Sequence, residues 1–167
     1  MPVRVVLPLA LLLVGLGQAQ GRQVCLVDQA GLSPPALGSF YREFQTLVGP
    51  RGLELAESEC EPEAIRLSLY RRAQGHDADV LGAARRESSK IAPRLEIYID
   101  PIVELLPESH CWNTVGRAVA RVAAHEVAHF FDQDQRHSEA GLLRVRFSGA
   151  QLASDDSYAF RWIPAEH

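Results

Sequence analysis

Residues 113–131 constrain the fold of this 167-residue chain most strongly. Asn113 or Thr114 can cap a helix, and alanine and valine then recur at helical spacing as far as Phe130. The pattern predicts a long helix that is apolar over most of its surface. Two histidines and a glutamate lie near its end, so the fold has to place these polar groups inside an apolar part of the helix.

A second helix is predicted nearer the N-terminus. Ser33 can cap it and Pro34 suits its first turn, while large apolar residues recur at helical spacing up to Val48. The pair at 49–50, Gly-Pro, is expected to end it. A short helical turn is also expected at 102–106.

Strands are predicted where apolar residues alternate with polar ones or form short β-branched runs, at 23–28, 53–57, 65–70, 80–84 and 94–100. The rest of the polar stretch 71–93 is expected to be a loop. This order predicts an α/β fold in which a mixed, twisted sheet packs against helices. A long C-terminal tail is expected to pack back onto these elements.

Residues 1–19 have the layout of a secretory signal peptide. Arg4 precedes an apolar run from Val5 to Leu16, and small and polar residues follow up to Ala19. The run is too short to cross a bilayer comfortably and no second one follows, so no integral membrane segment is expected. Cleavage would leave a single domain, residues 20–167, in a secreted or periplasmic protein.

Export places the three cysteines in an oxidising compartment, where two of them can pair. We expect Cys60 to pair with Cys111, because Cys25 lies in an apolar run typical of a buried strand. The residues before Cys25 do not favour a lipid anchor. The formal net charge of −4 gives no reason to expect nucleic acid as a partner, and we expect a monomer.

The motif HEVAH at 125–129 has the HExxH pattern of zinc hydrolases. Positions i and i+4 face the same side of a helix, so His125 and His129 can both reach one Zn²⁺ at about 2.1 Å. Glu126 lies beside them, where a carboxylate can take a proton from water and pass it to a leaving amine. The alternative is that the two histidines and the glutamate are structural groups that bond to other polar residues. The apolar helix around them argues against this alternative.

A catalytic zinc needs a third protein ligand and one open position. We expect His137 to be that ligand, because imidazole is the commonest partner of such a pair and the polar run DQDQR lets the chain leave the helix after Phe131. An exposed loop residue is the alternative reading of His137. Other candidate donors are Asp132, Asp134, Glu139, Asp155 and Asp156. The remaining histidines, His76, His110 and His167, are interpreted as exposed residues.

HEVAH is followed by His137-Ser138, then by 141–144, GLLR, and by Arg146-Phe147. This run resembles small secreted bacterial metalloproteases of the zincin superfamily, whose typical pattern is HExGHLLLG followed by HSxxGIMRARW. The similarity extends weakly over the order of strands and helices from residue 25 to residue 106. The resemblance implies a metzincin-like fold with an active-site helix and a turn after the third ligand. It also implies that 80–84 is an antiparallel edge strand, to which an extended peptide adds.

Two positions depart from the pattern of these look-alikes. Leu143 stands where they have a methionine beneath the metal ligands, a change that preserves packing because the two residues have similar volumes. Gln133 stands where they have a glycine that leaves the helix in a left-handed turn. We therefore expect either a different and costlier turn at Gln133, or a helix break at Asp132 or Asp134.

These observations predict an exported zinc metallopeptidase that acts on a peptide or protein, with Glu126 as general base and then acid. Tyr158, His110 and Arg144 are candidates for stabilising the oxyanion, without a ranking among them. A non-catalytic zincin-like protein that binds a metal or a partner is the rival hypothesis. A closed structural site with Asp134 as fourth donor is a further alternative.

Overall fold

The computed structural model describes residues 22–73 and 79–163. The predicted signal peptide, His76 and His167 lie outside the described residues. No helix in the described part of the chain combines the length and the apolar content needed to span a bilayer.

Five strands form one mixed sheet in the order β2-β1-β3-β5-β4. The strands are β1 (Arg22–Asp28), β2 (Leu53–Ala56), β3 (Ile65–Tyr70), β4 (Gly82–Glu87) and β5 (Lys90–Tyr98). All neighbours are parallel except β4 and β5, which pair antiparallel and leave β4 at the sheet edge. The mixed sheet packed against helices confirms the predicted α/β class.

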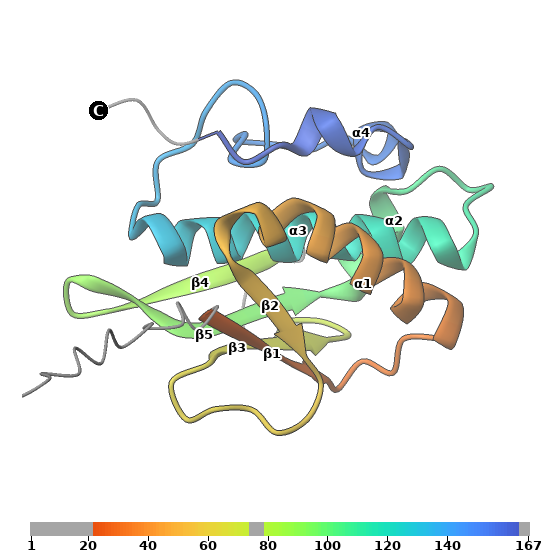
Figure 1. Ribbon diagram of the computed structural model, residues 1–167. Coiled ribbons are helices and arrows are strands. Elements are labelled where there is room, and N and C mark those ends of the chain that lie inside the picture. The colour runs from red at the N-terminus through yellow and green to blue at the C-terminus, as the bar shows by residue number, and fades with distance from the viewer. Residues whose placement is uncertain (1–21, 74–78, 164–167) are drawn as a thin grey trace, which may run out of the picture.

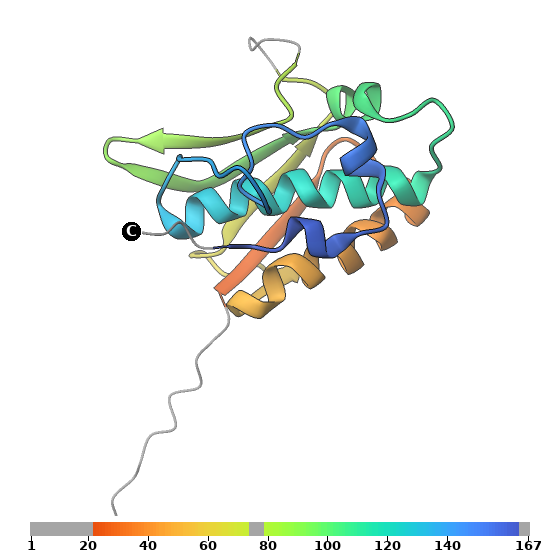
Figure 2. The same ribbon diagram turned by 90° about the horizontal axis from the view of Figure 1, so that it is seen from above.

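The helices lie on one face of this sheet (Figure 1). They are α1 (Pro34–Val48), α2 (Ile99–Leu105), α3 (Trp112–Asp132) and α4 (Gly149–Ala153), with short 3-10 turns η1 (Gly49–Arg51) and η2 (Ser157–Phe160). Seen from above, the C-terminal segment 141–163 lies across α3 (Figure 2). Because α3 has the sheet on one side and this segment on the other, it is apolar nearly all round, as its sequence indicates.

Side chains at every second strand position form the lower half of the core. Val24 on β1, Leu67 on β3 and Ile97 on β5 are fully buried. The upper half comes from α1 and α3, which approach closely at Gly116. A Cβ added there would lie 1.9 Å from the carbonyl oxygen of Ala36, so a larger residue would force the two helices apart.

The segment predicted as a loop, 71–93, contains more strand than its polarity indicates. β4 runs to Glu87 and β5 begins at Lys90, whereas the prediction placed strands at 80–84 and 94–100. Pro93 is tolerated because it lies just before the first residue of β5 that pairs with β3, and beside an irregularity in the pairing with β4. The outer strand is charged, as edge strands often are, and this hides its strand character from a search for apolar alternation.

The disulfide differs from the predicted one: Cys25 is bonded to Cys60, with Cα atoms 5.7 Å apart, and Cys111 is a free, exposed thiol. The prediction assumed that a cysteine in a buried strand is out of reach. Alternation along β1 instead turns Cys25 away from the helices, towards the face under which the β2–β3 loop runs (Figure 1). A disulfide is consistent with an extracellular location.

Candidate metal centre

The C-terminal end of α3 sets the direction of the chain towards His137. The helix ends at Asp132, and Gln133 adopts a left-handed conformation with φ 53°. The expected change of turn type or of break position is therefore wrong: the chain keeps the left-handed turn without a glycine. This conformation costs a residue with a Cβ roughly 1–2 kcal/mol.

Hydrogen bonds from the Gln133 side chain offset that cost. Its Nε2 donates to the carbonyls of Phe130, at 2.7 Å, and of Ile91, at 3.2 Å, while its Oε1 accepts from the Ile91 N–H at 2.9 Å. Each such bond contributes on the order of 1 kcal/mol. The glutamine thus stabilises the turn and ties it to β5.

The turn brings three histidines together. The Nε2 atoms of His125 and His129 lie 2.9 Å apart, and those of His129 and His137 lie 3.3 Å apart. The candidate donor atoms of all three rings lie within 4.8 Å of one another. Among residues 22–73 and 79–163, this is the one cluster of three histidine, cysteine or acidic side chains with the spacing of a metal site. His125 and His129 are buried, and His137 is exposed.

The partners of the other ring nitrogens determine the tautomers. Nδ1 of His125 lies 2.7 Å from the carbonyl oxygen of Leu142, and Nδ1 of His129 lies 2.7 Å from that of Asp134. A carbonyl oxygen only accepts, so each Nδ1 carries the proton and each neutral ring has a lone pair on Nε2. Burial lowers the pKa of His125 to about 4 and also lowers that of His129, which favours these neutral rings.

Two lone pairs that converge at 2.9 Å repel each other unless a cation lies between them. Zinc at about 2.1 Å from each nitrogen of a tetrahedral site separates its nitrogen donors by about 3.4 Å, near the spacing of these Nε2 atoms. The donor set therefore fits a divalent metal ion. Metal-binding histidines also typically donate their other ring N–H to a carbonyl oxygen, as His125 and His129 do here.

Glu126 is buried beside His125, against the backbone of β4. A Cβ added to Gly82 would lie 3.0 Å from its Oε1, so a larger residue at this position would crowd the carboxyl. Burial raises the pKa of Glu126 to about 8, and a hydrogen bond from the backbone of Ala84 opposes the rise. The carboxyl is thus tuned towards the range in which a group exchanges protons near neutral pH.

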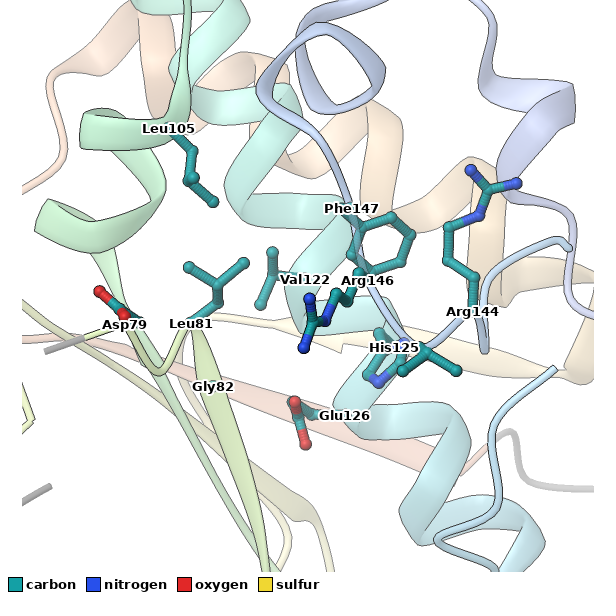
Figure 3. Close-up of a pocket in the computed structure, with 11 residues that line it drawn as sticks. Asp79, Leu81, Gly82, Leu105, Val122, His125, Glu126, Arg144, Arg146 and Phe147 are labelled. Carbon is teal, nitrogen blue, oxygen red and sulfur yellow. The ribbon is translucent and has the colours of Figure 1, made fainter. Parts of the chain in front are cut away.

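His125 and Glu126 line a cleft of about 490 Å³ between β4, α3 and the C-terminal segment (Figure 3). Its apolar walls come from Leu81, Leu105, Val122, Val145 and Phe147, and its charged lining from Asp79, Arg144 and Arg146. Phe147 also contacts the His125 ring edge-on, with centroids 5.6 Å apart. The residues after His137 therefore supply both a wall of the cleft and, through Leu142, the hydrogen bond that orients His125.

The other acidic candidates are engaged elsewhere. The Asp132 carboxylate accepts from the indole of Trp162, that of Asp134 pairs with Arg136, and that of Asp155 pairs with Arg117. Asp156 accepts from backbone N–H groups at the start of η2, and Glu139 is exposed outside the cluster. The structure brings together the three predicted histidines and none of these carboxylates.

Of the three candidates for the oxyanion, only Arg144 lines the cleft. Tyr158 is 72% exposed and borders a separate hollow, and His110 is held against the carbonyl of Pro107. The sequence analysis gave no role to Arg146 or to the Leu142 carbonyl. No local signal in the sequence marks either group, because both roles depend on how the C-terminal segment packs over α3.

A second buried polar cluster lies one turn earlier on α3. Arg121 is fully buried, its Nε donates to Glu43 at 2.7 Å and its guanidinium lies 4.1 Å from the ring centre of Phe160. Its Nη1 donates to the carbonyls of residues 151, 152 and 154 at 2.9–3.1 Å, and Ser157 donates to the other Glu43 oxygen. Of the Arg121 nitrogens, only Nη2 lacks a partner among the described atoms. This cluster fastens the C-terminal segment to α1 and α3.

A comparison of the chain with protein-family models found no match, and a search of the curated proteins found none either. The evidence for the site is therefore its own geometry: three convergent histidines, two of them on a long helix beside a mixed five-stranded sheet, fit a zincin-like metal site.

Proposed function

We propose that this protein is an exported zinc-dependent metallopeptidase. His125, His129 and His137 would hold the metal ion, and Glu126 would act as the general base and then the general acid. The observation that carries the proposal is the convergence of the histidine Nε2 atoms, with the Nδ1–H groups of His125 and His129 already bound to carbonyls.

A Zn²⁺ ion held there would act as a Lewis acid that polarises a substrate carbonyl and makes water more acidic. Glu126 lies next to the metal cluster in sequence and lines the same cleft as His125. Its carboxylate would accept a proton from the attacking water and later donate it to the departing amine. A carboxyl whose pKa lies near neutrality can do both.

Three donors leave one position of a tetrahedral ion free, which separates catalytic from structural zinc sites. The closed alternative needs a fourth donor, and its candidate, Asp134, is paired with Arg136 at 2.7 Å. This pairing favours the open site over the closed one. His125 also lines a cleft that a substrate can enter.

The position of β4 supports a peptide as substrate. It is the antiparallel edge strand of the sheet and borders the cleft through Gly82. An extended peptide could add to this edge through main-chain hydrogen bonds and lie across the metal site. The zincin resemblance of 125–147 implies the same arrangement, while the Cys25–Cys60 disulfide and the apolar leader are consistent with export.

The proposal is tested first by metal content. We expect about one zinc per purified chain, measured by atomic emission, and we expect His137→Ala to lose it. His110→Ala is the matched control, because it removes a half-buried histidine outside the cluster and should leave the zinc in place. A wild-type protein that takes up no zinc would overturn the metal site.

Catalysis is tested with Glu126→Gln, which keeps the size of the side chain. We expect the variant to keep its zinc and to lose about 100-fold or more of its activity on an unfolded protein such as reduced casein. If the wild type binds zinc and cleaves no peptide or protein, the non-catalytic zincin-like reading replaces the enzyme.

A further inference from the structure

The cleft contains a cation that has no partner among the described residues. Arg146 is exposed, lines the same cavity as His125 and Glu126, and takes part in no ion pair or hydrogen bond found in the described part of the chain. Its guanidinium extends towards the middle of the cleft, whereas that of Arg144 extends away from it (Figure 3). Asp79 lies on the far side of Leu81 (Figure 3).

With a divalent ion bound, the cleft would be opposite in charge to the whole chain, because its two arginines and two acidic residues, Asp79 and Glu126, offset each other. The chain carries a formal net charge of −4. A divalent ion on three neutral imidazoles would keep its positive charge, and Arg146 would add to it in a cleft whose walls are partly apolar. In such surroundings a guanidinium binds a carboxylate more strongly than it does in water, and it can do so through two parallel hydrogen bonds.

We propose that Arg146 recognises a carboxylate of the substrate, so that the site prefers peptides with a negative charge beside the bond to be cleaved. This inference rests on the proposed function, because the same cleft has to bind the peptide. The carboxylate comes either from an aspartate or glutamate side chain or from the C-terminus of the peptide. Both present the same two oxygens to the guanidinium.

The apolar walls support a flexible acidic group rather than a free small anion. Val122 and Phe147 line the same cavity as Arg146 and His125. The methylene groups of a glutamate-like side chain can pack on these walls while its carboxylate reaches Arg146. A small inorganic anion would gain the charge interaction without this packing.

The test measures binding, so it does not depend on turnover. The zinc-loaded protein is titrated by calorimetry with glutaric acid monohydroxamate, whose hydroxamate binds the metal and whose other end is a carboxylate. The probe of reference is the same molecule with a carboxamide in place of the carboxylate. We expect the carboxylate probe to bind about 10-fold tighter or more.

Three variants assign that preference to one residue. Arg146→Gln should abolish it, and Arg146→Lys should keep part of it, because lysine retains the charge without the planar fork. Arg94→Gln is the matched control: it removes an exposed arginine from the hollow beside the disulfide, so the preference should stay unchanged. If Arg146→Gln weakens both probes equally, the arginine stabilises the metal-bound group and the inference fails.

Peptide cleavage separates the two sources of the carboxylate. A mixture of peptides is digested with the C-termini either free or amidated, and the cleavage sites are sequenced. Acidic residues enriched near the cut in both mixtures indicate a side-chain carboxylate, and cleavage near the C-terminus that amidation abolishes indicates a terminal one. Cleavage with neither pattern would overturn the inference and leave the peptidase intact, whereas failure of both hydroxamates to bind would overturn the metal site and the inference together.

Discussion

Helix α3 carries two buried polar clusters one turn apart, and they differ in where their nitrogen atoms find partners. Arg121 bonds to Glu43 and to three carbonyls of the C-terminal segment, all inside the protein. His125 and His129 use Nδ1 in the same way, but their Nε2 lone pairs converge on each other and on His137. Burial of polar groups therefore does not mark a site by itself. A site is marked by donor atoms, such as these Nε2 nitrogens, that the fold orients but leaves without a bonding partner of their own.

The largest loss of stability is expected at the Arg121 cluster, whose hydrogen bonds are all made inside the protein. Arg121→Met leaves the Glu43 carboxylate buried without its cation, so we expect the free energy of unfolding to fall by about 3–5 kcal/mol. Urea denaturation of the metal-free protein measures this. His125→Ala in the same protein removes a neutral ring and one hydrogen bond to a carbonyl, so its cost should be smaller, about 1–2 kcal/mol.

The control for the buried ion pair is the double variant Glu43→Leu, Arg121→Met. It removes both charges together, and we expect it to recover at least half of the loss, because a buried pair contributes little beyond the cost of separating its members. A loss below about 1 kcal/mol for Arg121→Met alone would contradict the structural role given to this cluster.

A smaller effect on stability, dependent on pH, is expected from Glu126 and His125 at the metal site. Because the folded pKa of Glu126 is about 8 against an ordinary value of 4.5, the folded protein keeps a proton that the unfolded chain releases between these values. The stability of the metal-free protein should therefore fall as pH rises, by at most about 1.4 kcal/mol per pH unit from this group. His125, with a lowered pKa of about 4, acts in the opposite direction below pH 6.5.

The window from about pH 7.5 to 8.5 isolates the carboxyl, since His125, with an ordinary pKa of 6.5, is almost wholly neutral there in both the folded and the unfolded state. We expect the fall in that window to disappear in Glu126→Gln, with chelator present throughout and denaturant midpoints measured at each pH. An equally steep fall in the variant would assign the pH dependence to another group and contradict the raised pKa of Glu126.

The smallest effect is expected from Leu143→Met, which restores the residue found in the look-alikes. Leu143 is 4% exposed and packs in the core, and a change between residues of similar volume costs less than about 1.5 kcal/mol. The zinc Kd should stay within about threefold of the wild-type value, measured by competition with a chromogenic chelator. A tenfold change in the zinc Kd would show that the residue at position 143 affects the metal site through more than its volume.

Local sequence signals predict the elements whose side chains follow a regular period. The apolar alternation of β3 and the helical spacing of α1 mark both within a residue of their observed bounds, and HEVAH marks the buried part of the site. His137 lies beside them, as expected from the preference of such a pair for a third imidazole and from the polar run that lets the chain leave the helix.

The features that sequence analysis missed depend on contacts between distant segments. The partner of Cys25 is decided by which face of β1 it occupies, and the hairpin of β4 and β5 is hidden by charges along an exposed edge. The role of Arg146 depends on the cleft, which exists only once β4, α3 and the C-terminal segment have packed together. A local pattern contains none of this information.

Gln133 has a consequence for how departures from a sequence pattern are judged. β5 begins before the first residue that pairs with β3, and the amide of Gln133 bonds to both main-chain groups of Ile91 there, as a neighbouring strand would. Gln133→Gly would relax the backbone at the turn. It would also remove the side chain that bonds to the N–H and the carbonyl of Ile91. Gln133 therefore serves the fold in a way that glycine could not, and its presence does not count against the metal site.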